Sequence, residues 1–265
     1  MKVAALPFDV LPGQVAHNTE QALAAIEQCA AQQVQLLALP EKWTTSFMTS
    51  YSHEMREASE DALNIVHAAA AAAGLIVVGS APGGDGDKPA NQAHLLGVAG
   101  NLRPYSKRML FSPTGEGRQV ERGDQQPVVV ETPIGRIMPV VCYDLRFPEI
   151  CREALYGNAD FLICCAQWPT PRAHLFELLT RARAAENQMF VISCNRSGVA
   201  ALDGMQPMQF PGIAYVADPL GEIVSKSDKG RLLISEINLE FAEKVRTQVP
   251  ISNDLRKAGL WPSQD

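Results

Sequence analysis

Residues 136–150 read RIMPVVCYDLRFPEI, and this stretch decides the fold class. The apolar run 136–141 is typical of a buried strand, and Cys142 falls where that strand ends. Pro148 suits the first turn of a helix, because its missing N–H would have no helical partner there. The helix is expected to run to about Tyr156. A strand followed by a reactive side chain and a helix is typical of a layered α/β domain.

The same alternation of short apolar runs and helix-length segments continues on both sides. Strands are expected over residues 2–6, 34–39, 75–80, 94–98, 128–131, 161–165, 189–194, 213–217 and 232–237, and another begins at Leu102. Helices are expected from Asn18 or Thr19, from Ser59 to Gly74, and over 170–188 with a buried face of Leu175, Leu178, Leu179 and Ala182. Residues 82–87 are expected to join two antiparallel strands, and 128–141 to form a hairpin.

The composition restricts the class of protein. The chain has 265 residues with 29 acidic and 23 basic side chains, so its net charge is −6. This balance lacks the positive field of nucleic-acid binding proteins, and a DNA or RNA partner is disfavoured. No apolar run approaches the roughly 20 residues that cross a bilayer, and the first residues lack a signal-peptide core. We therefore expect a cytoplasmic protein without a membrane partner, whose six cysteines stay reduced.

A single domain is expected over residues 1–265, because no repeat or linker divides the chain. Its last segment, 239–265, is expected to dock as a C-terminal tail on the domain or on a partner subunit. The apolar anchors for this docking are Phe241, Val245, Leu255 and Trp261.

Three reactive side chains stand at the ends of predicted strands. Glu41 ends the stretch LLALPE, Lys107 ends RPYSK, and Cys142 lies within PVVCYD. Layered α/β proteins bind ligands outside the ends of their strands, so side chains that are distant in sequence converge there. The three residues are therefore candidates for one catalytic site.

The segments around these residues resemble the nitrilase superfamily of carbon-nitrogen hydrolases. The resemblance rests on LALPEKW, YSKRMLF, GEGRQVERGD, VVCYDLRFPE and the long stretch QWPTPRAHLFELLTRARAAENQMFVISCNRSG over residues 167–198. It implies an α/β fold built as a four-layer αββα sandwich, a homodimer or higher homo-oligomer, and a Glu41, Lys107 and Cys142 site with no metal or other cofactor. It also matches Glu116 to the family's second glutamate, although Glu121 lies close in the same loop.

The chemistry of such a site can be argued from the side chains. A free thiol has a pKa near 8.5 and needs a proton acceptor before it attacks an amide. Glu41 is expected to take the proton, while Lys107 and the amino end of the helix after Cys142 are expected to favour the thiolate. The Lys107 ammonium and the backbone N–H of Tyr143 are suitable donors to the oxyanion of the tetrahedral intermediate. Glu116 is expected to hold Lys107 and a substrate amide or water in place.

Four further residues are candidates for substrate binding. Arg172 and Arg196 could each bind a carboxylate through two parallel hydrogen bonds, although a structural ion pair or solvent exposure is the alternative for both. Trp43 and Trp168 adjoin the motif segments and could form walls of a pocket, whereas the alternative is a place in the core.

Other polar residues are assigned to the scaffold. Asp144 and Arg146 are expected to form a charged pair that fixes the turn after the nucleophile, and contact with the substrate is the alternative. The five histidines lack metal-ligand spacing, and the nearest approach is His174 with Glu177. We expect no metal site.

The leading hypothesis is a thiol amidohydrolase that cleaves a small linear carboxamide to a carboxylate and ammonia. Within the resembled family, Cys-Tyr-Asp at 142–144 and Asn-Arg at 195–196 favour the omega-amidase-like branch, which points to ω-amides of 2-oxo acids. Gln167 and Ala214 depart from that branch's usual pattern.

Several alternatives share the fold. An N-carbamoyl amino-acid hydrolase, an amidase for a deaminated peptide such as deaminated glutathione, and a nitrilase would use the same core. Non-catalytic alternatives are a scaffold protein and a redox sensor that uses the adjacent Cys164 and Cys165.

Overall fold

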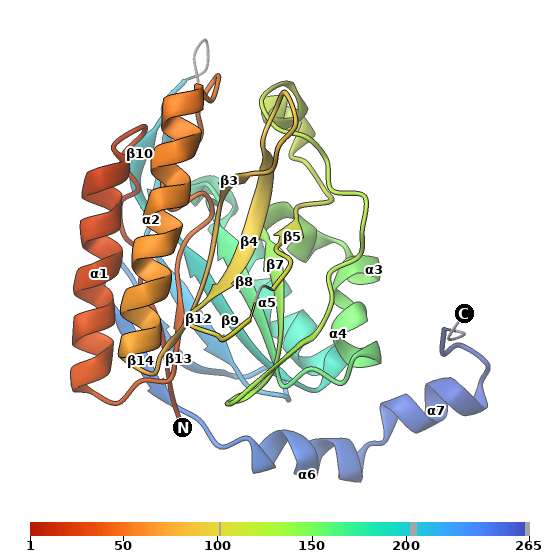
Figure 1. The fold of residues 1–265 in the computed structure, drawn as a ribbon. Coiled ribbons are helices and arrows are strands. Elements are labelled where there is room, and N and C mark those ends of the chain that lie inside the picture. The colour runs from red at the N-terminus through yellow and green to blue at the C-terminus, as the bar shows by residue number, and fades with distance from the viewer. Residues whose placement is uncertain (101, 202–205, 263–265) are drawn as a thin grey trace.

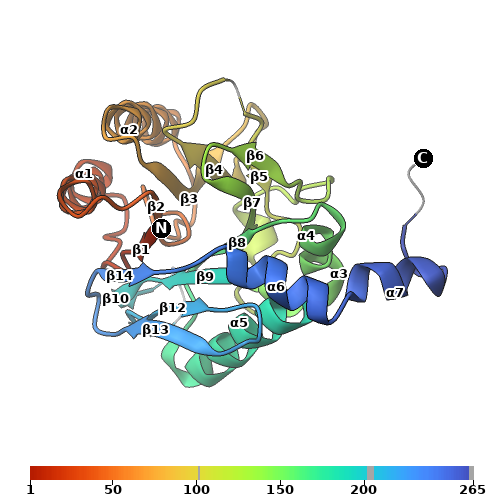
Figure 2. The same cartoon turned by 90° about the horizontal axis from the view of Figure 1, so that it is seen from below.

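The computed structural model describes residues 1–100, 102–201 and 206–262. Two six-stranded mixed sheets form its centre (Figures 1 and 2). The first has the order β14-β1-β2-β3-β4-β5, with β14 at Leu233–Glu236, β1 at Lys2–Ala5, β2 at Leu36–Ala38, β3 at Ile76–Gly83, β4 at Ala90–Leu96 and β5 at Tyr105–Ser106. The second has the order β13-β12-β9-β8-β7-β6, with β13 at Ile223–Ser227, β12 at Ala214–Ala217, β9 at Phe190–Asn195, β8 at Phe161–Ala166, β7 at Gly135–Val141 and β6 at Val130–Thr132.

Helices cover the outer faces of the two sheets. Against the first sheet lie α1 (Val15–Ala31) and α2 (His53–Ala72), and against the second lie α3 (Pro148–Cys151), α4 (Glu153–Tyr156) and α5 (Ala173–Asn187) (Figure 2). The sheets face each other through an apolar layer that contains Val3 and Ala5 of β1. The side chain of Ala4 belongs instead to the layer beneath α1 and α2, because successive side chains of a strand point to opposite faces. The expected four-layer αββα arrangement is confirmed.

Several predicted strands occur at or near their expected positions. Residues 82–87 lie between the antiparallel strands β3 and β4, and β6 and β7 form the expected hairpin. Three observed strands were not predicted from the sequence: β13, and the two-stranded hairpin of β10 (Ser197–Ala200) and β11 (Met208–Pro211). These strands are short, and most of their residues are only partly buried, so no continuous apolar run marks them.

The predicted starts of the first two helices were wrong. The first helix begins at Val15, and Asn18 is buried within it, where its amide bonds the backbone of Leu11 and of Thr44. The second helix begins at His53, because Ser52 is its N-cap and accepts a hydrogen bond from Met55 N at 3.3 Å.

The predicted buried face of α5 was correct at Leu175 and Leu179, which pack against the core, but wrong at Leu178. Leu178 is 58% exposed, whereas Phe176, Thr180 and Arg183 are buried. The Thr180 hydroxyl bonds the hydroxyl of Ser193 at 2.8 Å, and Arg183 Nε donates to the carbonyl of Leu145 at 3.0 Å. Apolar periodicity did not identify the most buried positions of α5, because polar side chains with buried partners occupy several of them.

The C-terminal segment divides into two helices. Helix α6 (Glu240–Gln248) packs on the domain through Ala242 and Val245, which are buried. Helix α7 (Ile251–Lys257) has no buried residue and extends beside the body of the molecule (Figure 1). Trp261 contacts the ring of Tyr156 at a centroid distance of 5.1 Å. Of the predicted tail 239–265, residues 263–265 lie outside the described residues, and docking on a partner stays a prediction.

Candidate active site

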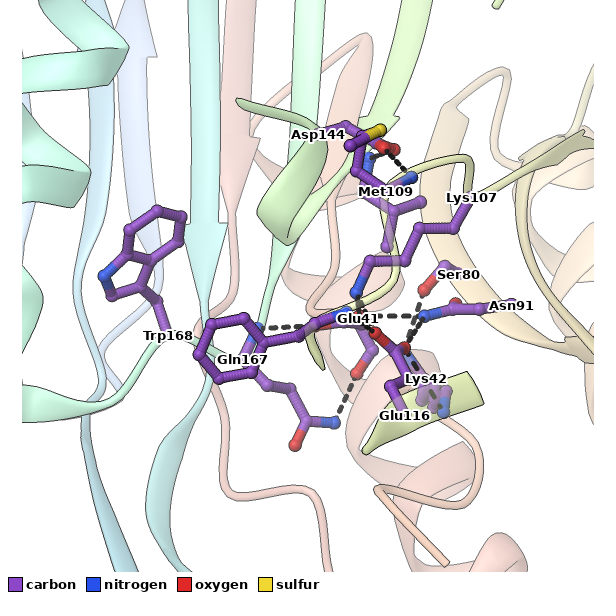
Figure 3. A network of polar contacts seen from close by, with 12 residues as sticks. Glu41, Lys42, Ser80, Asn91, Lys107, Met109, Glu116, Asp144, Gln167 and Trp168 are labelled. Carbon is purple, nitrogen blue, oxygen red and sulfur yellow. Dashed lines mark hydrogen bonds and ion pairs between the residues drawn. The ribbon is translucent and has the colours of Figure 1, made fainter. Parts of the chain in front are cut away.

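The three candidate side chains are brought together from separate strands. Glu41 follows β2, Lys107 follows β5 directly, and Cys142 follows β7 in the opposite sheet. Lys107 Nζ lies 2.8 Å from Oε1 of Glu41 and 2.8 Å from Oε2 of Glu116, so one ammonium bridges two carboxylates (Figure 3). All three of these charged side chains are buried.

The carboxylate of Glu41 is held by donors on both oxygens. Oε1 also accepts a hydrogen bond from Asn91 Nδ2 at 2.8 Å, and Oε2 accepts one from the backbone N–H of Gln167 at 3.1 Å. The side-chain amide of Gln167 donates to the carbonyl oxygen of Glu41 at 2.6 Å (Figure 3). These hydrogen bonds fix the orientation of the Glu41 carboxyl group.

Glu116, and not Glu121, is the second carboxylate of the site. Besides Lys107, Oε2 of Glu116 accepts the backbone N–H of Phe111 at 2.8 Å. The loop returns past Gly123, whose N–H donates to the Lys107 carbonyl at 2.9 Å. A Cβ at Gly123 would lie 2.1 Å from the Ser106 carbonyl oxygen, so glycine allows the close approach.

Cys142 sits on a sharply turned backbone. Its φ of 48° lies in the left-handed region, which non-glycine residues occupy at a cost in free energy. Residues 142–146 form a 3₁₀ turn, and the predicted helix follows it from Pro148 as α3 and α4. Asp144 stabilises this turn: Oδ2 accepts Val141 N and the Tyr105 hydroxyl, and Oδ1 accepts Met109 N.

The pKa of the Cys142 thiol also differs from the sequence-based expectation. Burial and then the negative charge of Glu41 raise the pKa of the Cys142 thiol well above its usual range, and the positive charge of Lys107 only partly opposes them. The expectation that every effect favours the thiolate was therefore wrong. The thiol is protonated at rest and must lose its proton as it attacks.

The cysteine opens into a cavity of about 280 Å³. Its lining includes Phe47, Lys107, Phe111, Pro113, Thr114, Cys142, Tyr143, Arg146, Gln167, Trp168, Pro169, Arg172 and Met208. Two of the four candidate substrate-binding residues, Trp168 and Arg172, are thus at the cavity. The indole N–H of Trp168 donates to the carbonyl of Arg172 at 2.9 Å, which fixes the ring in the wall.

The other two candidates lie outside the cavity lining. Arg196 is buried and forms an ion pair with Asp9 at 2.6 Å, while its Nη1 donates to Gln167 Oε1 at 3.0 Å. Trp43 is buried against the first sheet, where a Cβ at Gly79 would lie 2.6 Å from its ring. Neither side chain lines the cavity, because Arg196 is held by internal polar partners and Trp43 is packed in the core beneath the first sheet.

Arg146 was assigned to a pair with Asp144, and the structure separates them. Its guanidinium lies 5.4 Å from the centre of the Trp168 ring and faces the cavity. Asp144 fixes the turn without it. The sequence offered a signal, since Arg146 lies four residues after Cys142, but its direction depends on the 3₁₀ turn.

Three residues that contact the site were not predicted from the sequence: Asn91, Lys42 and Gln167. Asn91 lies within a strand, and nothing local distinguishes it. Lys42 directly follows Glu41, and Gln167 precedes Trp168, so their positions beside motif residues were visible. Their roles depend on neighbours from other elements.

Within the described residues there is no group of three or more His, Cys, Asp or Glu side chains that could hold a metal ion. The six cysteines are free thiols. No described helix has the length and apolar character of a membrane span.

Comparison with known proteins agrees with this fold. The family model for carbon-nitrogen hydrolases matches residues 2–247, which is most of the chain. The protein therefore belongs to the carbon-nitrogen hydrolase family.

The chain is also similar to curated relatives and to solved structures. The chain is 29% identical to the 2-oxoglutaramate amidase of Bacillus subtilis (strain 168), over 96% of this chain and 97% of the relative. It is 31% identical to the omega-amidase YafV of Escherichia coli (strain K12), over 85% of this chain and 86% of the relative. The chain superposes on a CN-hydrolase superfamily protein of Xanthomonas campestris with a TM-score of 0.82, 27% identity and 96% coverage of both chains. The crystal structure of that protein has an arsenic adduct in its active site. An amidase from Nesterenkonia sp. has the same fold, with a TM-score of 0.81, 23% identity and 95% coverage of both chains.

Proposed function

We propose that the protein is a thiol amidohydrolase that cleaves the ω-amide of a small 2-oxo acid to a carboxylate and ammonia. The observation that carries this proposal is the convergence of Glu41, Lys107 and Cys142 beside a cavity that also presents two arginines. The family defines hydrolysis of a carbon-nitrogen bond. The names of two relatives, 2-oxoglutaramate amidase and omega-amidase, support the substrate class.

The first half-reaction forms a thioester. Glu41 takes the thiol proton while the Cys142 sulfur attacks the amide carbon, and the carbonyl oxygen becomes an oxyanion. Lys107 uses two of its three N–H bonds on Glu41 and Glu116, which leaves one for the oxyanion. The backbone N–H of Tyr143 is the second donor. Glu41 then returns its proton to the leaving nitrogen, the carbon-nitrogen bond breaks, and ammonia leaves.

The second half-reaction hydrolyses the thioester. Glu41 takes a proton from a water molecule, the hydroxide attacks the acyl carbon, and the carbon-sulfur bond breaks. The proton returns to the sulfur, which restores the Cys142 thiol and releases the acid. Glu116 holds Lys107 in place throughout.

Two arginines support an acidic substrate. Arg146 is half-buried beside Trp168, and Arg172 lies at the same cavity. In the part of the chain that the structure describes, neither guanidinium forms an ion pair with a carboxylate. A guanidinium binds a carboxylate through two parallel hydrogen bonds, so either is suited to the acid end of the substrate.

Ammonia release from a panel of substrates tests the proposal. The panel contains 2-oxoglutaramate, simple aliphatic amides, carbamoyl amino acids and nitriles. We expect the highest kcat/KM for 2-oxoglutaramate, loss of turnover in Cys142→Ala, and retained turnover in the control Cys165→Ala, whose thiol lies between the sheets. A preference for carbamoyl amino acids or nitriles, or turnover in Cys142→Ala, would contradict it.

We also propose a cytoplasmic homo-oligomer, of two or more copies. Exposed apolar side chains such as Leu178 and Leu220, together with the extended α7, support the assembly. Light scattering at assay concentration tests it, and a monomer would contradict it. Fractionation of the source cells, with the protein in the soluble cytoplasmic fraction, tests the location.

A further inference from the structure

A second buried lysine lies on the far side of Glu116 from Lys107. Lys42 Nζ is 3.8 Å from Oε1 of Glu116, while Lys107 Nζ is 2.8 Å from Oε2 (Figure 3). The Lys42 side chain is only 1% exposed. Glu116 is therefore bracketed by two ammonium groups, one on each oxygen.

The backbone and the surroundings hold Lys42 in this position. Its φ of 43° lies in the left-handed region, and its N–H donates to Ser80 Oγ at 2.8 Å. Its Nζ lies 4.8 Å from the centre of the Phe47 ring and 5.4 Å from that of Tyr51. A strained backbone beside Glu41 persists only where the surrounding structure fixes it, which points to a defined role for the side chain.

Charge balance indicates what that role is. Glu41 and Glu116 contribute two negative charges, and Lys107 alone would leave a buried site with a net charge of −1. Two carboxylates that share one site raise the pKa of one of them, because both cannot ionise without compensation. With Lys42 present, two cations face two anions.

The shift of Glu116 is consistent with this balance. Burial acts to raise the pKa of Glu116, but the charges of Lys107 and then Lys42 outweigh it and lower the pKa to about 2. The other titratable groups that face the cluster are the Cys142 thiol, the Tyr51 hydroxyl and the Asp144 carboxyl.

We propose that Lys42 is a positioning residue for amide hydrolysis, which acts through Glu116 by supplying the second cation that keeps Glu116 ionised beside Lys107. The inference rests on the proposed function for its kinetic test. Without Lys42, Glu116 binds a proton at a higher pH than in the wild type. A protonated Glu116 loses its hold on Lys107.

The pH dependence of kcat/KM tests this role. Lys42→Met keeps an unbranched chain of similar length without the charge. We expect its acidic limb to move to higher pH by about one unit, so that the loss approaches tenfold below the limb and disappears above it. Lys42→Arg should keep the wild-type limb, and so should the control Lys88→Met, because Lys88 is exposed and only contacts the Gly117 carbonyl. A loss in Lys42→Met that is equal at all pH values would overturn the proposal.

Infrared spectroscopy gives a readout that needs no substrate. In a titration from pH 7 downward, Lys42→Met should develop a protonated-carboxyl band at a pH about one unit higher than Lys42→Arg, and the double variant with Glu116→Gln should lose that difference because it removes one charge of each sign. The same onset pH in folded Lys42→Met and Lys42→Arg would overturn the proposal even if amide turnover fails in the wild type. A wild type without amide turnover, but with the expected bands, would contradict only the proposed function.

Discussion

The backbone nitrogen of Gln167 lies 3.1 Å from Oε2 of Glu41, although 126 residues separate them in the chain. The Gln167 side chain makes the contact reciprocal, because its amide donates to the Glu41 carbonyl at 2.6 Å. Its Oε1 accepts Nη1 of Arg196, which in turn pairs with Asp9. The orientation of Glu41 thus depends on the end of β8 and on a chain of contacts that reaches the N-terminal part of the protein.

Gln167→Leu is expected to lower kcat about tenfold and the free energy of unfolding by roughly 1–3 kcal/mol. The reason is that the Glu41 carbonyl and the Arg196 guanidinium each lose a buried hydrogen-bond partner. Steady-state kinetics and urea denaturation measure the two effects. Gln92→Leu is the matched control, since Gln92 is half-buried on β4 and bonds only Ser106 Oγ, at 3.3 Å. Equal effects from the two substitutions would argue against a role of Gln167 in holding Glu41 in place.

Alkylation of Cys142 by iodoacetamide is expected to be slow at neutral pH and to rise about tenfold per pH unit between pH 7 and 9. The thiol pKa is raised by burial and by Glu41, so the thiolate is a small fraction that grows with pH. Mass spectrometry locates the label, which should favour Cys142 because it opens to the cavity whereas Cys165 is fully buried. A rate that levels off below pH 7 would indicate a preformed thiolate instead.

Arg146→Met is expected to raise the KM for 2-oxoglutaramate by ten- to a hundredfold, and Arg172→Met to raise it less. Arg146 is half-buried beside Trp168, whereas Arg172 is exposed, and a guanidinium binds a carboxylate more strongly away from water. Turnover of a simple aliphatic amide should change little in either variant. Arg103→Met serves as an exposed control. A parallel loss for both classes of amide would mean that Arg146 shapes the site without binding the acid group.

Acid unfolding is expected to involve His94. Burial lowers the pKa of His94 from 6.5 to about 4, and its Nε2 has no hydrogen-bond partner among the described residues. The unfolded chain therefore binds more protons than the folded protein as the pH falls from 6.5 to 4, and stability decreases across that window. His94→Gln should reduce this slope in denaturation curves, while the exposed His53→Gln should not. An unchanged slope in His94→Gln would exclude the imidazole as its source.

The candidate catalytic positions could be predicted because each follows a local signal. Glu41 and Cys142 directly follow apolar runs that became strands, and Pro148 started its helix as expected. The residue at which α2 starts could not be predicted from a local signal, since Ser52 and Ser59 are both suitable N-caps. Ser52 is the N-cap in the structure, whereas Ser59 lies within the helix and bonds Thr44 Oγ1 at 2.7 Å inside the packed layer.

The sequence by itself determined the layered α/β class, the family resemblance, and the presence of a thiol, a carboxylate and an ammonium at strand ends. These properties depend on local periodicity and on residue type, which a linear chain displays directly. The tertiary structure decided which charges became partners: it turned Arg196 inward to Asp9, turned Arg146 to the cavity, and placed Lys42 beside Glu116. It also decided that Cys142 is protonated at rest. Burial and long-range charge contacts arise only when distant segments pack together, and they control both the direction of a side chain and the pKa of its acid group.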